Sequence, residues 1–171
     1  MWVEGLRRHL DDLRDDTYED AAGGERPARY AAAFELLTPV ALGVLQDMNA
    51  LLLAGSGDVS VRSPESDGQG GLIGSWLLTW PELAKARNRF TGERLAPVTL
   101  SAVFPSGFVH PHLVAGGRVD PGAPSIIAWP MQIITVADAN RHQQLLWALA
   151  TAEVHDRIYQ ATWRIIPVAT A

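Results

Sequence analysis

Two histidines, His110 and His112, are the side chains whose types and spacing best suit chemistry in this sequence. They flank Pro111 in the segment SGFVHPHL, and a proline favours extended geometry at the residue before it. Residues two apart in an extended segment face the same side, so the two imidazoles should project together, next to Phe108. Such a pair can bind a divalent metal ion or exchange protons near neutral pH.

A metal ion would need at least one further ligand. The predicted long helix at 139–160 offers four: His142, Glu153, His155 and Asp156. Helical spacing puts His155 beside Tyr159 and two alanines, so we expect it to be a buried histidine with a shifted pKa and a third catalytic candidate. The alternative is a core histidine hydrogen-bonded to the backbone or to Tyr159. A single axial histidine could also hold haem, although no attachment motif is present.

Six tryptophans are a high number for 171 residues. Aromatic side chains on predicted strands and helices usually build the core, and they also line pockets for flat, apolar ligands. Both alternatives stay open for most of them. The candidate substrate-binding residues are Trp76, Phe108, Trp129 and Tyr159.

The composition excludes several classes of protein. The chain has no cysteine, which rules out disulfides, thiol catalysis and cysteine-held metal clusters. Its net charge of −5 lacks the basic surplus that phosphate neutralisation requires, so we expect no nucleic-acid partner. No apolar run approaches the ~20 residues of a membrane helix, and the first residues do not resemble a secretory signal. We therefore expect a cytoplasmic protein that does not associate with membranes.

The hydropathy pattern predicts a helical first third followed by a mixed region. The predicted helices are at 1–20, 28–37, 39–54, 81–88 and 139–160, and the predicted strands are at 58–62, 71–80, 98–104, 125–135 and 162–168. Residues 1–57 should form a helical segment that packs on a sheet built by 58–171, giving one compact domain overall. Pro130 inside the fourth strand indicates a bulge or an edge position.

From position 71 the predicted order is strand, helix, strand, strand, helix, strand. This order predicts an α+β fold with a ferredoxin-like, split-βαβ antiparallel sheet carrying an N-terminal helical extension. The strand at 125–135 is apolar on both sides, so its sheet needs a second layer or a second subunit. In predicted order alone, this topology is similar to that of dimeric α+β barrel proteins, and we expect a homo-oligomer.

These features favour a small enzyme of the lyase, isomerase or hydrolase type that acts on a small, aromatic molecule. His110 and His112 would be its acid–base groups or would hold a divalent metal. One alternative is a non-catalytic protein that binds a small molecule or haem. Another is an assembly subunit that docks through its N-terminal helices.

Overall fold

The computed structural model describes residues 2–115, 128–162 and 164–167. The longest helix, α3 (Arg26–Leu53), forms one continuous element where the sequence predicted two, and Pro39 lies inside it. Both halves of α3 are buried against the rest of the protein, which compensates for the one backbone hydrogen bond that Pro39 cannot donate. The hydroxyl of Thr38 donates to the carbonyl of Phe34, one turn earlier. The helix ends at Ala54, whose φ of 48° is left-handed.

The predicted N-terminal helix is divided into two. Helix α1 (Trp2–Asp15) is followed by the short α2 (Thr17–Ala22), and the break falls at Asp16, which has a φ of 52°. Aspartate tolerates this left-handed conformation better than most residues, since its short polar side chain can bond locally. The break lets α2 turn back so that Tyr18 is buried.

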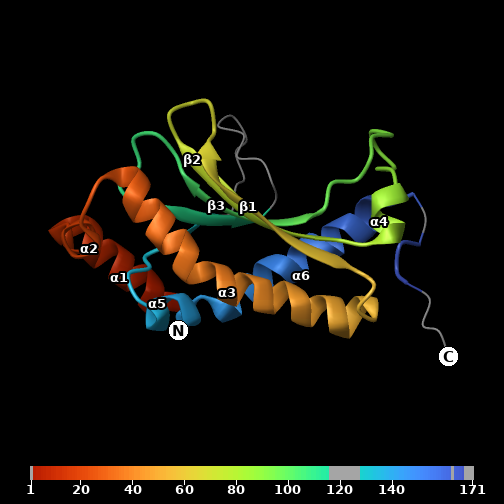
Figure 1. The fold of residues 1–171 in the computed structure, drawn as a ribbon, viewed down its shortest axis with the longest axis horizontal. Helices are drawn as coiled ribbons and strands as arrows, with labels where there is room; N and C mark the ends of the chain where they lie inside the picture. Colours follow the sequence, from red (N-terminus) through yellow and green to blue (C-terminus); the bar gives the residue numbers. More distant parts are fainter. Residues whose placement is uncertain (1, 116–127, 163, 168–171) are drawn as a thin grey trace.

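Five strands form one antiparallel sheet. They are β1 (Asp58–Ser66), β2 (Leu72–Thr79), β3 (Val98–Phe104), β4 (His112–Ala115) and β5 (Ala128–Pro130). Their spatial order is β1-β2-β3-β4-β5, and each strand pairs with the next in the chain (Figure 1). The α+β class is therefore confirmed. A ferredoxin-like sheet is not, because a split-βαβ sheet interleaves its strands whereas these follow the chain.

The strands differ from their predicted bounds at the C-terminal side of the sheet. Strand β4 was not predicted, and β5 covers only part of the expected strand at 125–135, whose first residues lie outside the described ones. Pro130 ends β5 at the edge of the described sheet, which agrees with the expected edge position. Of the last predicted strand, the described residues 164–167 are not in a strand.

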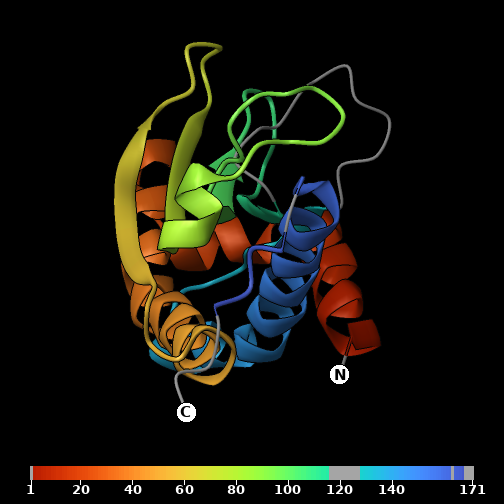
Figure 2. The same ribbon diagram turned by 90° about the vertical axis from the view of Figure 1, so that its right-hand side faces the viewer.

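Two long helices cover one face of the sheet. Helix α3 lies against β1 and β2, and α6 (Gln143–Gln160) lies beside α3 against β3 and β4 (Figures 1 and 2). Two helices are shorter: α4 (Pro81–Lys85) follows β2, and α5 (Val136–Arg141) directly precedes α6. The core between the layers contains large side chains from the sheet and both helices: Tyr30, Leu37, Leu45, Trp76, Leu100, Phe104 and Leu146.

Helix α3 is long and apolar enough to cross a membrane if length and composition are the only criteria. In this structure one side of it packs on the sheet. Its Tyr30 is fully buried and donates a hydrogen bond of 2.6 Å to the carbonyl of Ala102 on β3. This is how the core helix of a two-layer domain behaves.

Candidate functional site

His110 lies in the turn before β4 and is buried, with 2% of its surface exposed. Its Nε2 contacts the carboxylate of Asp12 on α1. The same carboxylate accepts hydrogen bonds from the backbone of Tyr18 and from the hydroxyl of Thr17, at 2.9 Å for the latter. His110 therefore holds α1 and α2 against the end of β4.

His112 lies on β4 and is partly buried. Its Nδ1 donates to the backbone carbonyl of His110 at 3.0 Å. His9 of α1 contacts both rings edge-on, with centroid distances of 5.0 Å to His110 and 5.9 Å to His112. Burial lowers the pKa of each of these three histidines, and that of His112 falls to about 4. With its pKa at about 4, the imidazole of His112 is neutral at pH 7.

The other predicted site residues are dispersed. Trp76 is fully buried, stacks on Phe34 at 4.5 Å and donates to Thr38. Phe108 is exposed and meets His112 edge-on. Tyr159 is exposed at the far end of α6, with the guanidinium of Arg89 above its ring. These side chains therefore do not share one pocket.

The expected burial of His155 is wrong, because this residue is on the exposed side of α6. The predicted helix is interrupted at His142, and it is His142 that is buried, with 7% exposed. The buried side of α6 runs through Leu145, Leu149 and Glu153, and His155 lies away from that side. Among the described residues, no group of three His, Cys, Asp or Glu side chains is placed to hold a metal ion.

A cavity of about 670 Å³ lies between α1, β5 and the junction of α5 with α6. Trp129 is the one predicted substrate-binding residue that lines it. Its walls combine two arginines, one glutamate, several amides and three apolar side chains. Six of the lining residues are Arg8, Trp129, Gln132, Asn140, Arg141 and His142.

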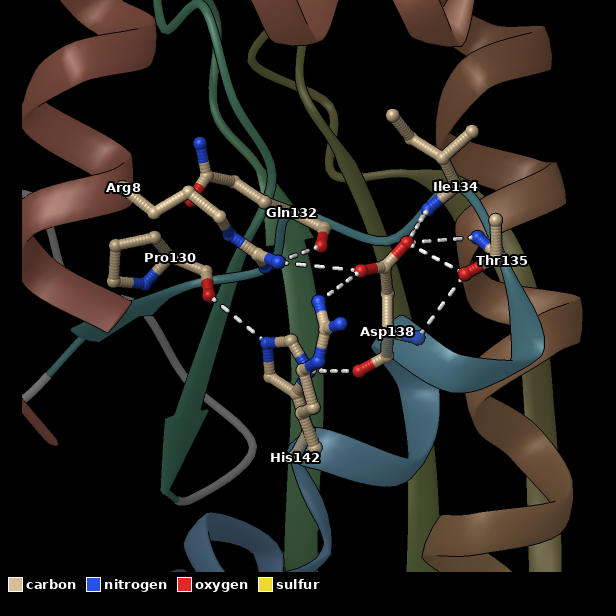
Figure 3. Close-up of polar contacts among 8 residues, drawn as sticks. Arg8, Pro130, Gln132, Ile134, Thr135, Asp138 and His142 are labelled. Atoms are coloured by element: carbon tan, nitrogen blue, oxygen red, sulfur yellow. Dashed lines mark hydrogen bonds and ion pairs between the residues drawn. The ribbon is translucent and has the colours of Figure 1, made fainter. Parts of the chain in front are cut away.

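Asp138 of α5 organises the wall of this cavity (Figure 3). Its carboxylate accepts from Arg8 at 3.2 Å and from Arg141 at 2.9 Å. It also accepts from the hydroxyl and the backbone N–H of Thr135, while the hydroxyl of Thr135 accepts from the backbone N–H of Asp138. This reciprocal capping box begins α5 at Val136, three residues before the predicted start.

The electrostatics of Asp138 favour its charged form. Burial alone would raise its pKa, but hydrogen bonds from Thr135 and the backbone of Ile134, together with the charge of Arg8, hold the pKa below its usual range. A charged Asp138 in turn fixes Arg8, whose second terminal nitrogen donates to the carbonyl of Gln132 at 3.1 Å. These two contacts hold the Arg8 side chain between α1 and the segment that follows β5.

His142 is the only imidazole among the described residues lining the cavity, and both its nitrogens face carbonyl oxygens (Figure 3). Nδ1 lies 2.9 Å from the carbonyl of Asp138, and Nε2 lies 3.3 Å from that of Pro130. Burial lowers the pKa of this ring, and the two carbonyls oppose that shift. Since neither nitrogen is directed at the open volume, His142 positions the α5–α6 junction.

Sequence reasoning missed Arg8, Gln132 and Arg141 as site residues. One signal is present in the sequence: the pattern T-x-x-D at 135–138 is the signature of a helix start, and the helix predicted at 139–160 did not take it into account. Nothing in the local sequence linked that cap to Arg8, which is 130 residues earlier.

Comparison with known proteins gives no family for this chain: no protein-family model, no curated protein and no solved structure matches it at a significant level.

Proposed function

We propose that this chain binds a small anionic molecule with a flat or apolar part, in the cavity between α1, β5 and the α5–α6 junction. The observation that carries the proposal is the convergence of Arg8, Arg141 and Trp129 on one cavity of about 670 Å³. Pockets for small ligands commonly have about 300 to 1,000 Å³ and combine apolar walls with a few polar groups that fix orientation.

The charges around the cavity favour an anion. Arg141 has a side chain that is 65% exposed, so its guanidinium can exchange its exposed pair with Asp138 for a carboxylate or phosphate of the ligand. The first turn of the 18-residue helix α6 also lines the cavity, and among the described residues no side chain caps it. The positive end of the helix dipole adds to the potential of the arginines. Glu4, which also lines the cavity, pairs with Arg7 at 2.7 Å.

Trp129 supplies the apolar surface. The ring approaches α1 at Gly5, where an added Cβ would lie 3.5 Å from it. A glycine at this position lets the indole lie close to the helix. The ring is partly buried and lines the cavity, where an indole can stack on a planar group.

The chemistry of the lining residues supports binding without catalysis. The described residues that line the cavity include no serine, threonine, cysteine, lysine or tyrosine. Its one imidazole faces two carbonyls. The expectation of an enzyme that uses His110, His112 and His155 stays a prediction, since none of these lines this cavity.

The test is a binding screen with purified protein. Thermal-shift measurements with a panel of aromatic carboxylates and small phosphorylated compounds should give hits, whose affinity is then measured by calorimetry. Arg141→Ala should weaken binding by about tenfold or more, since a charged hydrogen bond contributes about 1.5 to 3 kcal/mol. The matched control is Arg62→Ala, an exposed arginine on β1 outside the cavity.

Two results would contradict the proposal. One is equal affinity in Arg141→Ala and in the wild type, which would place the ligand elsewhere. The other is conversion of the ligand to a product, detected by mass spectrometry, which would favour the enzyme hypothesis instead.

A further inference from the structure

Helices α1 and α2 lie at one end of the molecule, and residues 23–25 join them to α3 (Figure 1). Gly23 and Gly24 in this connection have φ values of 59° and 69°, in the left-handed region that glycine adopts without strain. An added Cβ at Gly23 would meet no atom within 4 Å, so the connection is not packed against the body. The α1–α2 pair, residues 2–22, can therefore turn about this hinge while α3 stays folded.

The α1–α2 pair is held to the body by few apolar contacts. The three leucines of α1 are 46% to 51% exposed. Helix α1 meets the body instead through Arg8, which pairs with Asp138 of α5, and through His9 and Asp12. Of the residues in the pair whose burial is described, only Asp12 and Tyr18 are buried. Segments with few buried apolar contacts open at a lower free energy than the core does.

Three imidazoles, the histidine cluster, lie at the joint between the α1–α2 pair and the body. His9 belongs to α1, and its ring centroid lies 5.0 Å from that of His110 and 5.9 Å from that of His112. His110 also contacts the carboxylate of Asp12 and lies 5.1 Å from the ring of Tyr18. Opening of the pair therefore separates His9 from the other two rings and gives all three access to water.

Two rings of the histidine cluster are poorly placed to carry a proton. Nδ1 of His9 is buried and has no hydrogen-bond partner among the described residues. A neutral imidazole can leave this nitrogen unprotonated, whereas the cation would bury an unsatisfied N–H there. His112 donates to a backbone carbonyl and forms no ion pair within the described part of the chain. Burial lowers the pKa of all three rings, that of His112 to about 4.

The charged and titratable groups around the histidine cluster come from several elements. They are Arg8, Asp12 and Asp16 at α1, Tyr18 and Glu19 on α2, Arg29 on α3, and Asp138 on α5. Among the described residues, Asp12 alone pairs with an imidazole of the cluster, that of His110. The acidic groups of α2 and α5 pair with the two arginines, at 2.9 Å and 3.2 Å, and Asp16 is exposed. Protonation of His9 or His112 therefore gains no counter-ion.

We propose that the α1–α2 pair is a lid over the cavity, which the histidine cluster holds closed at neutral pH and releases in acid. Acid favours the open form because the rings bind protons more readily in water than when they are buried. Gly5 and Arg8 line the cavity, so the release opens it and withdraws one arginine from its wall. The gating of a bound ligand rests on the proposed function, whereas the release of the α1–α2 pair does not.

The experiment is hydrogen–deuterium exchange of the full chain without ligand at pH 7 and pH 5, read by mass spectrometry and corrected for the effect of pH on intrinsic exchange. An isolated helix of 14 residues is marginal in water, so α1 loses amide protection when it leaves the body. A return of His112 alone to its ordinary pKa would favour the open form by up to roughly 30-fold at pH 5. The protection factors of the α1–α2 pair should fall by about tenfold or more, while those of β2 and β3 stay unchanged.

The double variant His9→Gln/His112→Gln tests the trigger. It removes the two rings that lack a counter-ion and keeps the contact between His110 and Asp12. The α1–α2 pair of this variant should remain protected at pH 5. The matched control, His155→Gln, changes an exposed histidine on α6 and should lose protection as the wild type does. If the double variant does not fold by circular dichroism, His112→Gln alone takes its place.

Three outcomes would overturn the proposal. The first is an α1–α2 pair in the wild type that is as protected at pH 5 as at pH 7, and this comparison needs no variant. The second is equal loss of protection in β2 and β3, which would indicate global unfolding. The third is the same loss in His9→Gln/His112→Gln as in the wild type, which would assign the trigger to another group, such as the buried His142.

Discussion

Substituting Asp138 tests the residue that holds the two arginines of the cavity wall. Asp138→Ala removes the carboxylate that accepts hydrogen bonds from Arg8, Arg141 and Thr135. Loss of a capping interaction costs about 1 kcal/mol. The pair with Arg8, whose side chains are 38% and 14% exposed, contributes up to about 1 kcal/mol, and the more exposed pair with Arg141 contributes little. We therefore expect the free energy of unfolding to fall by about 2 kcal/mol.

The assay is urea and thermal unfolding followed by circular dichroism. For a chain of this size about 2 kcal/mol corresponds to a decrease in Tm of roughly 4 to 8 °C. Asp138→Asn keeps an acceptor oxygen without the charge and should give an intermediate loss. Asp47→Ala, an exposed aspartate on α3, is the control and should change stability by less than about 0.5 kcal/mol.

The pH dependence provides a second check on the same residue. The pKa of Asp138 is lowered in the fold, so its stabilisation is present above the ordinary carboxyl pKa and is lost as pH falls through the lowered value. The wild type and Asp138→Asn should therefore differ at neutral pH and converge in acid. The reasoning fails if Asp138→Ala is as stable as Asp47→Ala, or if the difference from Asp138→Asn does not change with pH.

Three further predictions concern the core and the histidines. Gly74→Ala should cost about 1 to 3 kcal/mol in urea unfolding, because an added Cβ would lie 2.5 Å from the Phe34 ring; an unchanged midpoint would contradict this close approach. Trp76→Ala should lose about 3 to 5 kcal/mol in the same assay, since the side chain is fully buried and stacked on Phe34, and a loss below about 1 kcal/mol would argue against that packing. Burial lowers the pKa of His112 from 6.5 to about 4, so its contribution to stability should be complete above pH 6.5 and should decline as the pH falls towards 4. The urea midpoint of His112→Gln should therefore change less with pH than that of the wild type. Identical dependence on pH in the two proteins would refute the burial of this ring.

Local patterns in the sequence predicted several elements well. The strands predicted at 71–80 and 98–104 correspond to β2 and β3, and the apolar repeat near the start corresponds to α1. The break at Asp16 and the continuity of α3 through Pro39 were not predicted. Both depend on burial of neighbouring segments, which outweighs the local preference of a single residue.

The candidate site was harder to predict. The sequence pointed to His110 and His112, which are chemically distinctive but are used here to hold α1 and to contact His9. The cavity instead joins Arg8 to residues more than 120 positions later. Its arginines and amides are common surface residue types, so their types alone give no signal.

The amino-acid sequence by itself determined the α+β class and the amphipathic character of α1, because each follows from spacing within a few turns or strands of chain. Only the tertiary structure decided the order of the strands, the convergence of Arg8 with Trp129 and Arg141, and the exposure of the apolar side of α1 to solvent. The physical reason is that periodicity fixes which side chains share a face, whereas the contacts available to that face depend on how distant segments pack.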